Sequence, residues 1–206
     1  MAKQKIILAT TSPRRHGLAQ TMGLDFEIVP SSYEEDMTQK MNPREMVMAF
    51  SYGKALDVSK KHKEGIVIGV DTICVFKGKN LGKPSSDKDA FKMLKSFSGK
   101  KQYVYSGVCL IDCKTGKTIK DYEVTEVYFK KMSDNEIKSY INTGEHKDKA
   151  GGYGIQDLSS IFIKKINGCY FNVMGFPIYN IYKNLTKLGV DIFQYERWSG
   201  VGIDKV

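Results

Sequence analysis

Long apolar stretches rich in β-branched residues alternate along this chain with segments whose apolar residues recur at helical spacing. The first kind favours strands and the second favours helices, so the alternation predicts an α/β fold. The expected strands cover residues 6–9, 26–29, 66–76, 103–112, 118–129 and 161–173. The turn-forming residues 114–116 join two of these stretches into an antiparallel hairpin, which predicts a mixed sheet.

Capping residues mark the expected starts of the helices. They are Ser12 before Pro13, Asn42 with Pro43 and Glu45, Ser86 with Asp89, and Ser133 with Glu136. No repeat, low-complexity segment or Pro/Gly-rich linker divides the chain. We therefore expect a single domain over residues 1–206, with a core at about 5–190 and a tail, 191–206, that has no clear period.

Lys and Arg outnumber Asp and Glu by 32 to 23, which gives a formal charge of +9 and favours an anionic partner such as a phosphate ligand, nucleic acid or acidic lipid. The lysines are spread along the chain, and their doublets are typical of solvated faces. No nucleic-acid-binding motif stands out, so no specific nucleic-acid partner is expected.

The four cysteines have neither CxxC spacing nor partnering histidines, which argues against a zinc site or a disulfide framework and favours a reducing compartment. The apolar run near the N-terminus is too short for a signal peptide or a membrane span. We expect a cytoplasmic protein without a membrane partner.

One charge, Asp71, interrupts the most apolar stretch of the chain, residues 66–76. An ionised carboxylate is strongly disfavoured in such surroundings unless it is paired or bound to a metal. At the carboxyl edge of a strand, Asp71 would face the crevice where α/β sheets bind ligands; a structural aspartate that caps a neighbouring loop is the alternative. Glu34 and Glu35, brought beside Asp71, would suit Mg²⁺ or Mn²⁺, although an exposed acidic loop is the simpler local interpretation.

Residues 9–15, ATTSPRR, predict a strand that turns directly into a helix at Pro13. Free backbone N–H groups, the Ser12 hydroxyl, Arg14 and Arg15 would converge there as a phosphate cradle. An ordinary helix cap with two solvated arginines is the alternative.

Two further lysines are candidates for anion binding. Residues 76–86 superficially resemble a P-loop, but the glycine spacing is too short and Pro84 stands where a Ser or Thr is required, so a Gly-rich hairpin that presents Lys83 is the better description. Lys54 lies in a helical segment, where it either covers apolar surface or points at an anion.

Residues 148–156 place three glycines, Lys149 and Gln156 between a helix and a strand. Glycines let backbone approach a ligand closely, and the Gln156 amide offers a donor and an acceptor suited to a base edge. A flexible turn explains the glycines equally well, but not the whole set.

Taken together, these motifs resemble the Maf family of nucleoside triphosphate pyrophosphatases over roughly residues 5–190. The motifs are ATTSPRR, YEED, GVDT, GKP, FSGKKQYVYSGV, TEVYF, DKAGGYGIQ and NGCYFNVMGFP, in that order. The resemblance implies an inosine-triphosphate-pyrophosphatase-like α/β fold with a long mixed sheet and a central cleft between two lobes. It also implies hydrolysis of a nucleoside triphosphate to the monophosphate and pyrophosphate with Mg²⁺ or Mn²⁺, and a homodimer.

The resemblance further implies roles for individual residues. Asp71 matches the family's proton acceptor, and Glu35 matches its cleft carboxylate, with Glu34 as second choice, so Glu35 and Asp71 are the candidate metal ligands. Residues associated with substrate choice are Arg14, Thr72 and Gln156. Positions that line the phosphate site are Ser12, Arg15, Lys54, Lys83 and Lys149.

The segment that ends in GYGIQ is similar to the subgroup acting on dTTP and UTP, so pyrimidine triphosphates or their modified forms are the expected substrates, with removal of non-standard nucleotides as a wider role. Val70, Phe97 and Phe176 depart from the commoner family residues, and Val70 adjoins the proton acceptor Asp71. The rivals are a pyrophosphatase for 7-methyl-GTP or another purine nucleotide, and a nucleic-acid-binding regulator of cell division.

Overall fold

A computed structural model describes residues 3–36 and 38–195 of the chain, and it consists of one mixed sheet flanked by helices. Its strands are β1 (Ile6–Leu8), β2 (Phe26–Ile28), β3 (Ile66–Phe76), β4 (Lys79–Leu81), β5 (Lys101–Asp112), β6 (Thr118–Phe129) and β7 (Ile163–Asn167). The order across the sheet is β2-β1-β3-β5-β6-β7, with β4 also on β3. β1 pairs in parallel with both β2 and β3, and all other pairs are antiparallel. The predicted mixed α/β fold is confirmed.

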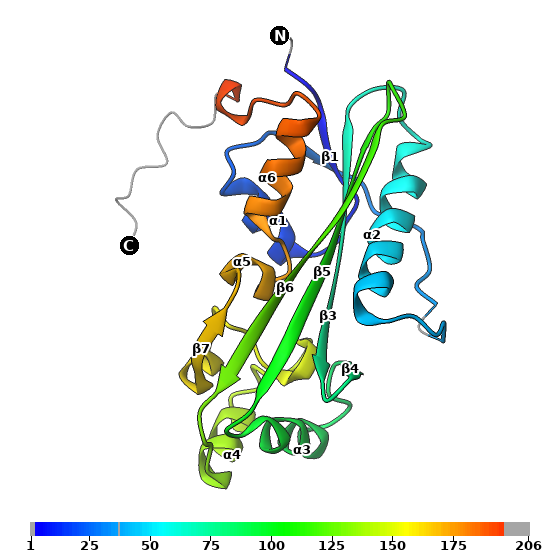
Figure 1. Cartoon of the computed structure of the whole chain (residues 1–206). Coiled ribbons are helices and arrows are strands. Elements are labelled where there is room, and N and C mark those ends of the chain that lie inside the picture. The colour runs from blue at the N-terminus through cyan, green and yellow to red at the C-terminus, as the bar shows by residue number, and fades with distance from the viewer. Residues whose placement is uncertain (1–2, 37, 196–206) are drawn as a thin grey trace.

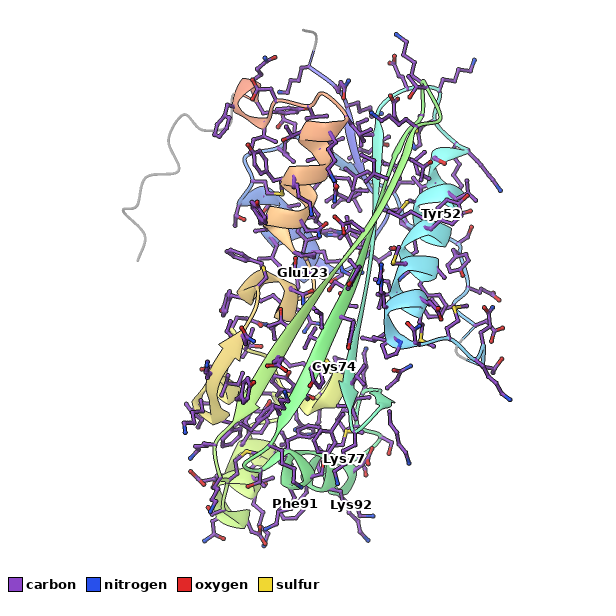
Figure 2. All side chains as sticks on the ribbon, viewed as in Figure 1. Tyr52, Cys74, Lys77, Phe91, Lys92 and Glu123 are labelled. Carbon is purple, nitrogen blue, oxygen red and sulfur yellow. The ribbon has the colours of Figure 1, made fainter. Side chains whose placement is uncertain are left out.

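The three long strands β3, β5 and β6 run the length of the molecule, with helices on both faces (Figure 1). The helices are α1 (Pro13–Gln20), α2 (Pro43–Ser59), α3 (Asp87–Phe97), α4 (Asp134–Asn142), α5 (Tyr170–Val173) and α6 (Ile178–Lys187). α2 covers one face of the sheet, while α1, α5 and α6 lie on the other face. α3 and α4 gather at the end of the sheet that carries β4, where Figure 2 shows Lys77, Phe91 and Lys92.

Two glycines let α2 lie unusually close to the sheet. A Cβ atom on Gly69 of β3 would come within 2.2 Å of the Ser51 carbonyl oxygen, and one on Gly107 of β5 within 2.0 Å of the Val47 carbonyl oxygen. Because side chains alternate between the faces of a strand, Asp71 shares the face of Gly69 and projects toward α2, whereas Thr72 faces the opposite side. The sheet register agrees, since Asp71 pairs with Gly107.

The capping predictions hold in large part. Asn42 and Ser133 form complete capping boxes, and the Ser86 side chain accepts a hydrogen bond from the Asp89 N–H. Ser12 occupies the N-cap of α1, but its side chain makes no capping bond, so the hydroxyl remains available to a ligand.

One expectation about the C-terminal third was wrong. Residues 161–173 do not form one strand: β7 ends at Asn167, Gly168 has φ +128, and α5 follows. The start of the predicted tail is ordered, since Ile192–Gln194 form a 3-10 turn and the buried Tyr195 donates a hydrogen bond to the Gln4 carbonyl, 2.6 Å away. The rest of the tail lies outside the described residues.

All four cysteines are free thiols, in agreement with the absence of a disulfide pattern. Burial raises the pKa of Cys74 and of Cys109 to about 12, so both remain protonated near neutral pH. In the described part of the chain, no helix is both long and apolar enough to cross a membrane.

Candidate active site

The site is built around an open edge of β3. β1 pairs with β3 only as far as Ile68, and β4 takes up pairing again at Cys74, so residues 70–73 have no strand partner on that edge in the described structure. Side chains from both faces of the sheet can meet through this gap. The middle of β3 is therefore exposed along this edge because β3 is long and its two neighbours there, β1 and β4, are short.

On the α2 face, Lys54 links two carboxylates. Its Nζ atom lies 2.7 Å from Asp71 Oδ1 and 2.5 Å from Glu35 Oε1. Only 7% of the Asp71 side chain and 15% of that of Lys54 are exposed, so the charge of Asp71 is paired and not stranded in the core. Asp71, the lone charge in the apolar stretch, thus belongs to an ion pair at the open edge of β3.

The loop that carries Glu35 is fixed to α2 at two points. The Tyr33 ring lies against Gly53, where a Cβ atom would fall 2.3 Å from the ring, so only glycine leaves room. Asp57 accepts hydrogen bonds from the Ser32 N–H at 2.8 Å and from the Ser31 and Ser32 hydroxyls. The pKa of Asp57 is lowered to about 2, chiefly by the Ser32 N–H bond.

The residues present suit a divalent cation. Asp71 Oδ2 is buried without a hydrogen-bond partner among the described residues, an arrangement that costs free energy unless a cation or water satisfies it. Asp71 and Glu35 provide the hard oxygen donors that Mg²⁺ and Mn²⁺ prefer. The described residues contain no group of three or more His, Cys, Asp or Glu side chains that would hold a metal alone, so a cation here needs water or phosphate oxygens as further ligands.

On the opposite face, Arg15 is held in place by two acceptors. Its Nε atom donates to the Gly175 carbonyl at 3.0 Å and Nη2 donates to Thr72 Oγ1 at 3.3 Å, while Thr72 Oγ1 lies 2.8 Å from Ser106 Oγ. The pKa of Arg15 is lowered overall by burial, and the nearby carboxylates of Asp71 and Glu35 offset part of this lowering. Arg15 therefore joins the two faces electrostatically and stays charged.

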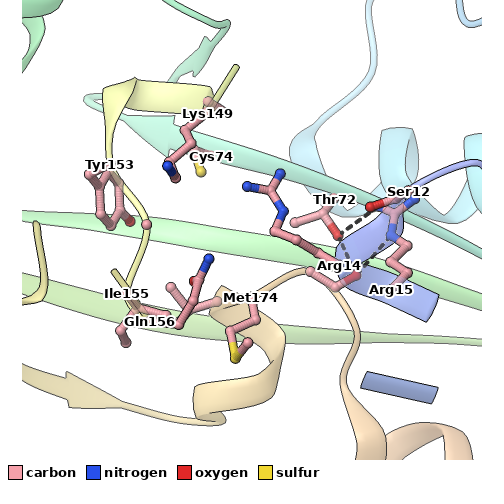
Figure 3. A pocket seen from close by; sticks show the side chains of 14 residues that line it. Ser12, Arg14, Arg15, Thr72, Cys74, Lys149, Tyr153, Ile155, Gln156 and Met174 are labelled. Carbon is pink, nitrogen blue, oxygen red and sulfur yellow. Dashed lines mark hydrogen bonds between the residues drawn. The ribbon is translucent and has the colours of Figure 1, made fainter. Parts of the chain in front are cut away.

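A cleft that is open to solvent begins beside Arg15 (Figure 3); it encloses about 630 Å³ when the solvent space at its mouth is included. Ser12, Arg14 and Arg15 come from the start of α1, and Thr72 and Cys74 from β3. The remaining lining comes from residues 149–150, 153–156 and 173–175. The two arginines mark one end of the cleft, and Tyr153, Ile155 and Gln156 mark the other.

The far end of the cleft is shaped by the glycine-rich segment. Lys149 Nζ donates to the Glu145 carbonyl at 2.6 Å and lies 3.3 Å from Asp157 Oδ2, which also accepts from the Gln156 amide at 2.9 Å. A Cβ atom on Gly154 would fall 2.5 Å from Asp157 Oδ2 and 2.9 Å from the Lys149 side chain, so a larger residue here would displace these two side chains.

Beneath that end, polar atoms are buried without partners. The Tyr153 hydroxyl and both amide atoms of Gln102 have no hydrogen-bond partner in the described part of the structure. Burial raises the pKa of Tyr153, and the nearby Cys74 thiol raises it further. Of these two residues, Tyr153 lines the cleft, whereas Gln102 is fully buried beneath it.

The structure gathers most of the predicted site residues into two groups. Ser12, Arg14, Arg15, Thr72, Lys149 and Gln156 line the cleft. Glu35, Lys54 and Asp71 form the charged group on the α2 face. Lys83 lies outside both groups, 3.2 Å from the exposed Asp148, and Glu34 is exposed.

Sequence reasoning missed Tyr153, Gly175 and Gln102. The Gly175 carbonyl orients Arg15, and Gly175 adopts φ +98, which favours glycine. Asn172, in the same motif, donates to the Val104 carbonyl and to Thr125 Oγ1 at 3.0 Å each, and thereby fixes α5 to the sheet. The motif NGCYFNVMGFP was the available signal, but it carries no charge that points to chemistry.

Comparison with known proteins agrees with this geometry. The family described as Maf-like protein matches residues 5–188. This chain belongs to the Maf-like family. A Maf-like relative from Caldicellulosiruptor bescii, named dTTP/UTP pyrophosphatase, is 43% identical over 94% of this chain and 99% of its own length.

Other Maf-like relatives carry the same name. Those from Thermoanaerobacter sp. X514 and Clostridium tetani are each 46% identical, over 89% and 90% of this chain and over 96% and 98% of their own lengths. Among solved structures, the Staphylococcus aureus Ham1 protein matches 61% of this chain and 72% of its own, with a TM-score of 0.40 and 11% identity.

Proposed function

We propose that this Maf-like protein hydrolyses dTTP and UTP to the nucleoside monophosphate and pyrophosphate. The names of the relatives support this substrate class. The observation that carries the proposal is a buried aspartate, Asp71, which is paired with Lys54 at 2.7 Å and electrostatically coupled to Arg15 of the adjoining cleft. A carboxylate base beside a cationic phosphate site is what attack on a triphosphate requires.

The two arginines and the free Ser12 hydroxyl would hold the triphosphate at the start of α1. Arg15 is already oriented by Gly175 and Thr72, so it can stabilise the developing negative charge without reorganising. Lys149 lies farther along the cleft and can reach the phosphates from the other side. Water attacks the α-phosphorus, the bond to the β-phosphate oxygen breaks, and pyrophosphate leaves.

Asp71 would orient the attacking water and accept its proton. Glu35 and Asp71 are the residues that would hold Mg²⁺ or Mn²⁺. Such a cation, when bound, neutralises phosphate charge and lowers the pKa of bound water. The reaction therefore draws on both faces of β3, and we propose that residues 1–206 act as one catalytic domain.

The base would lie at the opposite end, against residues 153–156. Gln156 presents its amide at the cleft and is held only by the neighbouring Asp157 among the described residues, so it can turn toward a base edge. We also propose a cytoplasmic homodimer, which light scattering of the purified protein would test.

A panel of triphosphates tests the substrate class. Release of pyrophosphate from dTTP, UTP, CTP, GTP and 7-methyl-GTP should be compared with Mg²⁺, with Mn²⁺ and with a chelator. The proposal expects metal-dependent turnover that is fastest on dTTP and UTP. Preference for 7-methyl-GTP, or salt-sensitive DNA binding without turnover, would contradict it.

A further inference from the structure

Lys54 stands where a divalent cation would have to bind. Its ammonium group touches one oxygen of each candidate ligand, Glu35 Oε1 at 2.5 Å and Asp71 Oδ1 at 2.7 Å. The cleft lining includes neither Lys54 nor Asp71. A single ammonium group thus contacts both carboxylates on the α2 face.

The ammonium and a divalent cation cannot share this place. Two positive charges a few ångströms apart in a partly buried site repel strongly, and both would compete for the same oxygens. The pair also leaves Asp71 Oδ2 unsatisfied, although the residue is only 5% exposed. The Lys54 ammonium donates to Asp71 Oδ1 and not to Oδ2, so Oδ2 can still accept a second partner such as a metal ion.

We propose that Lys54 is an exchangeable counter-ion: it occupies the metal position in the free protein and leaves it when the cation binds. The displaced ammonium is then available to phosphate oxygens at the open edge of β3. This inference rests on the proposed function, and it assigns Lys54 a role different from that of a fixed phosphate ligand. A lysine side chain suits such a role, because its flexible four-carbon stem lets the compact ammonium group move between positions.

The exchange predicts that Lys54 lowers metal affinity in the absence of nucleotide. The metal must first displace the Lys54 ammonium from the site. The apparent dissociation constant of the metal therefore exceeds its intrinsic value by a factor set by the strength of the Lys54 contact. Removal of the ammonium should therefore tighten metal binding, the opposite of what loss of an ordinary site residue does.

Binding of Mn²⁺ alone, followed by the electron paramagnetic resonance of the free ion at about pH 8, tests this directly. We expect Lys54→Met to bind Mn²⁺ about tenfold tighter than the parent, because a tenfold change corresponds to one modest polar contact. Lys60→Met, which removes the same charge from the exposed end of α2, should bind as the parent does. Equal or weaker binding by Lys54→Met would overturn the proposal.

Amine labelling of the unmodified protein gives a second test that does not depend on a variant's folding. Without metal, Lys54 should react slowly with acetic anhydride because both carboxylates hold it; with saturating Mn²⁺, its modification, read by mass spectrometry, should rise several-fold while that of Lys60 stays constant. Continued protection of Lys54 in the Mn²⁺-bound protein would overturn the exchange.

These results are separable from the proposed function. Pyrophosphate release from UTP together with unchanged labelling of Lys54 would leave the enzyme intact and remove the exchange. The Mn²⁺ effects without turnover of any triphosphate would support the exchange and remove the enzymatic proposal.

Discussion

The open edge of β3 and the far end of the cleft satisfy their polar groups in different ways. Around the open edge of β3, charges are paired before any ligand arrives, as with Lys54 and Asp71 or Arg15 and the Gly175 carbonyl. At the other end, Tyr153 and Gln102 bury polar atoms without partners. A ligand near Asp71 and Arg15 must exchange existing partners, whereas a ligand beside Tyr153 meets a residue whose hydroxyl has none among the described residues.

This contrast assigns different tasks to the two regions. A preorganised charge such as that of Arg15 stabilises a transition state because it need not move when charge develops. Unsatisfied buried polar groups discriminate among ligands, because a ligand without the matching group leaves them unsatisfied. Substitutions near Asp71 and Arg15 should therefore reduce turnover on every substrate, and substitutions at the base end should change the order of substrates.

The largest effect is expected for Asp71→Asn. Loss of the base should reduce turnover of UTP and dTTP roughly 100- to 10,000-fold. Asp112→Asn is the matched control, because Asp112 is a carboxylate that accepts turn N–H groups at the far end of β5. Pyrophosphate release by the two variants gives the comparison, and circular dichroism checks their folding. Full turnover by Asp71→Asn would show that another group accepts the proton.

Arg15→Ala should follow, with a loss on the order of 100-fold in kcat that is similar for UTP and CTP. The Arg15 guanidinium lies at the end of the cleft proposed to hold the phosphates, away from the end proposed to hold the nucleobase (Figure 3). Arg44→Ala removes an arginine that stacks 4.3 Å over the Tyr122 ring, and it should retain parental turnover. A loss confined to one nucleotide would place Arg15 in base recognition.

Gln156→Ala should alter selectivity more than rate. We expect the ratio of kcat/KM for UTP over CTP to change by about tenfold, while kcat on UTP changes less. Gln194→Ala is matched to it, since the Gln194 amide also bonds a nearby aspartate, Asp191, but far from the cleft. Unchanged ratios across UTP, CTP and 7-methyl-GTP would remove Gln156 from base reading.

Asp57→Asn should have the smallest effect, a few-fold loss of kcat/KM, because it loosens the loop that carries Glu35. Since the folded pKa is lowered to about 2, the stability that Asp57 contributes is present above its unfolded value near 4 and is lost as the pH falls through about 2.

The difference in melting temperature between the parent and Asp57→Asn should therefore be full at about pH 6 and vanish toward about pH 2. Asp191→Asn, which weakens a turn at Phe193, tests whether any such loss affects turnover. A constant difference across this range would mean that the Asp57 charge does not anchor the loop.

The sequence predicted the sheet well wherever apolar runs were long. β3, β5 and β6 lie where expected, and the lone charge in β3 identified Asp71 as a residue that needed a partner. These features depend on local pattern, which a single sequence contains.

Other features depend on contacts between distant segments. The open edge exists because β1 has three residues and β3 has eleven, a mismatch that is visible only once the strands are paired. The apolar run at 161–173 was read as a strand, but Gly168 and the bonds of Asn172 to β5 and β6 make its second half a helix. The pairing of Lys83 with Asp148 likewise has no local signal.

Hydrolysis of UTP in water enriched in heavy oxygen, with the products read by mass spectrometry, tests the central claim most directly. If a water positioned by Asp71 attacks the α-phosphorus, UMP carries the heavy oxygen and the released pyrophosphate carries none. Label in pyrophosphate, or UDP and phosphate as the products, would contradict the account.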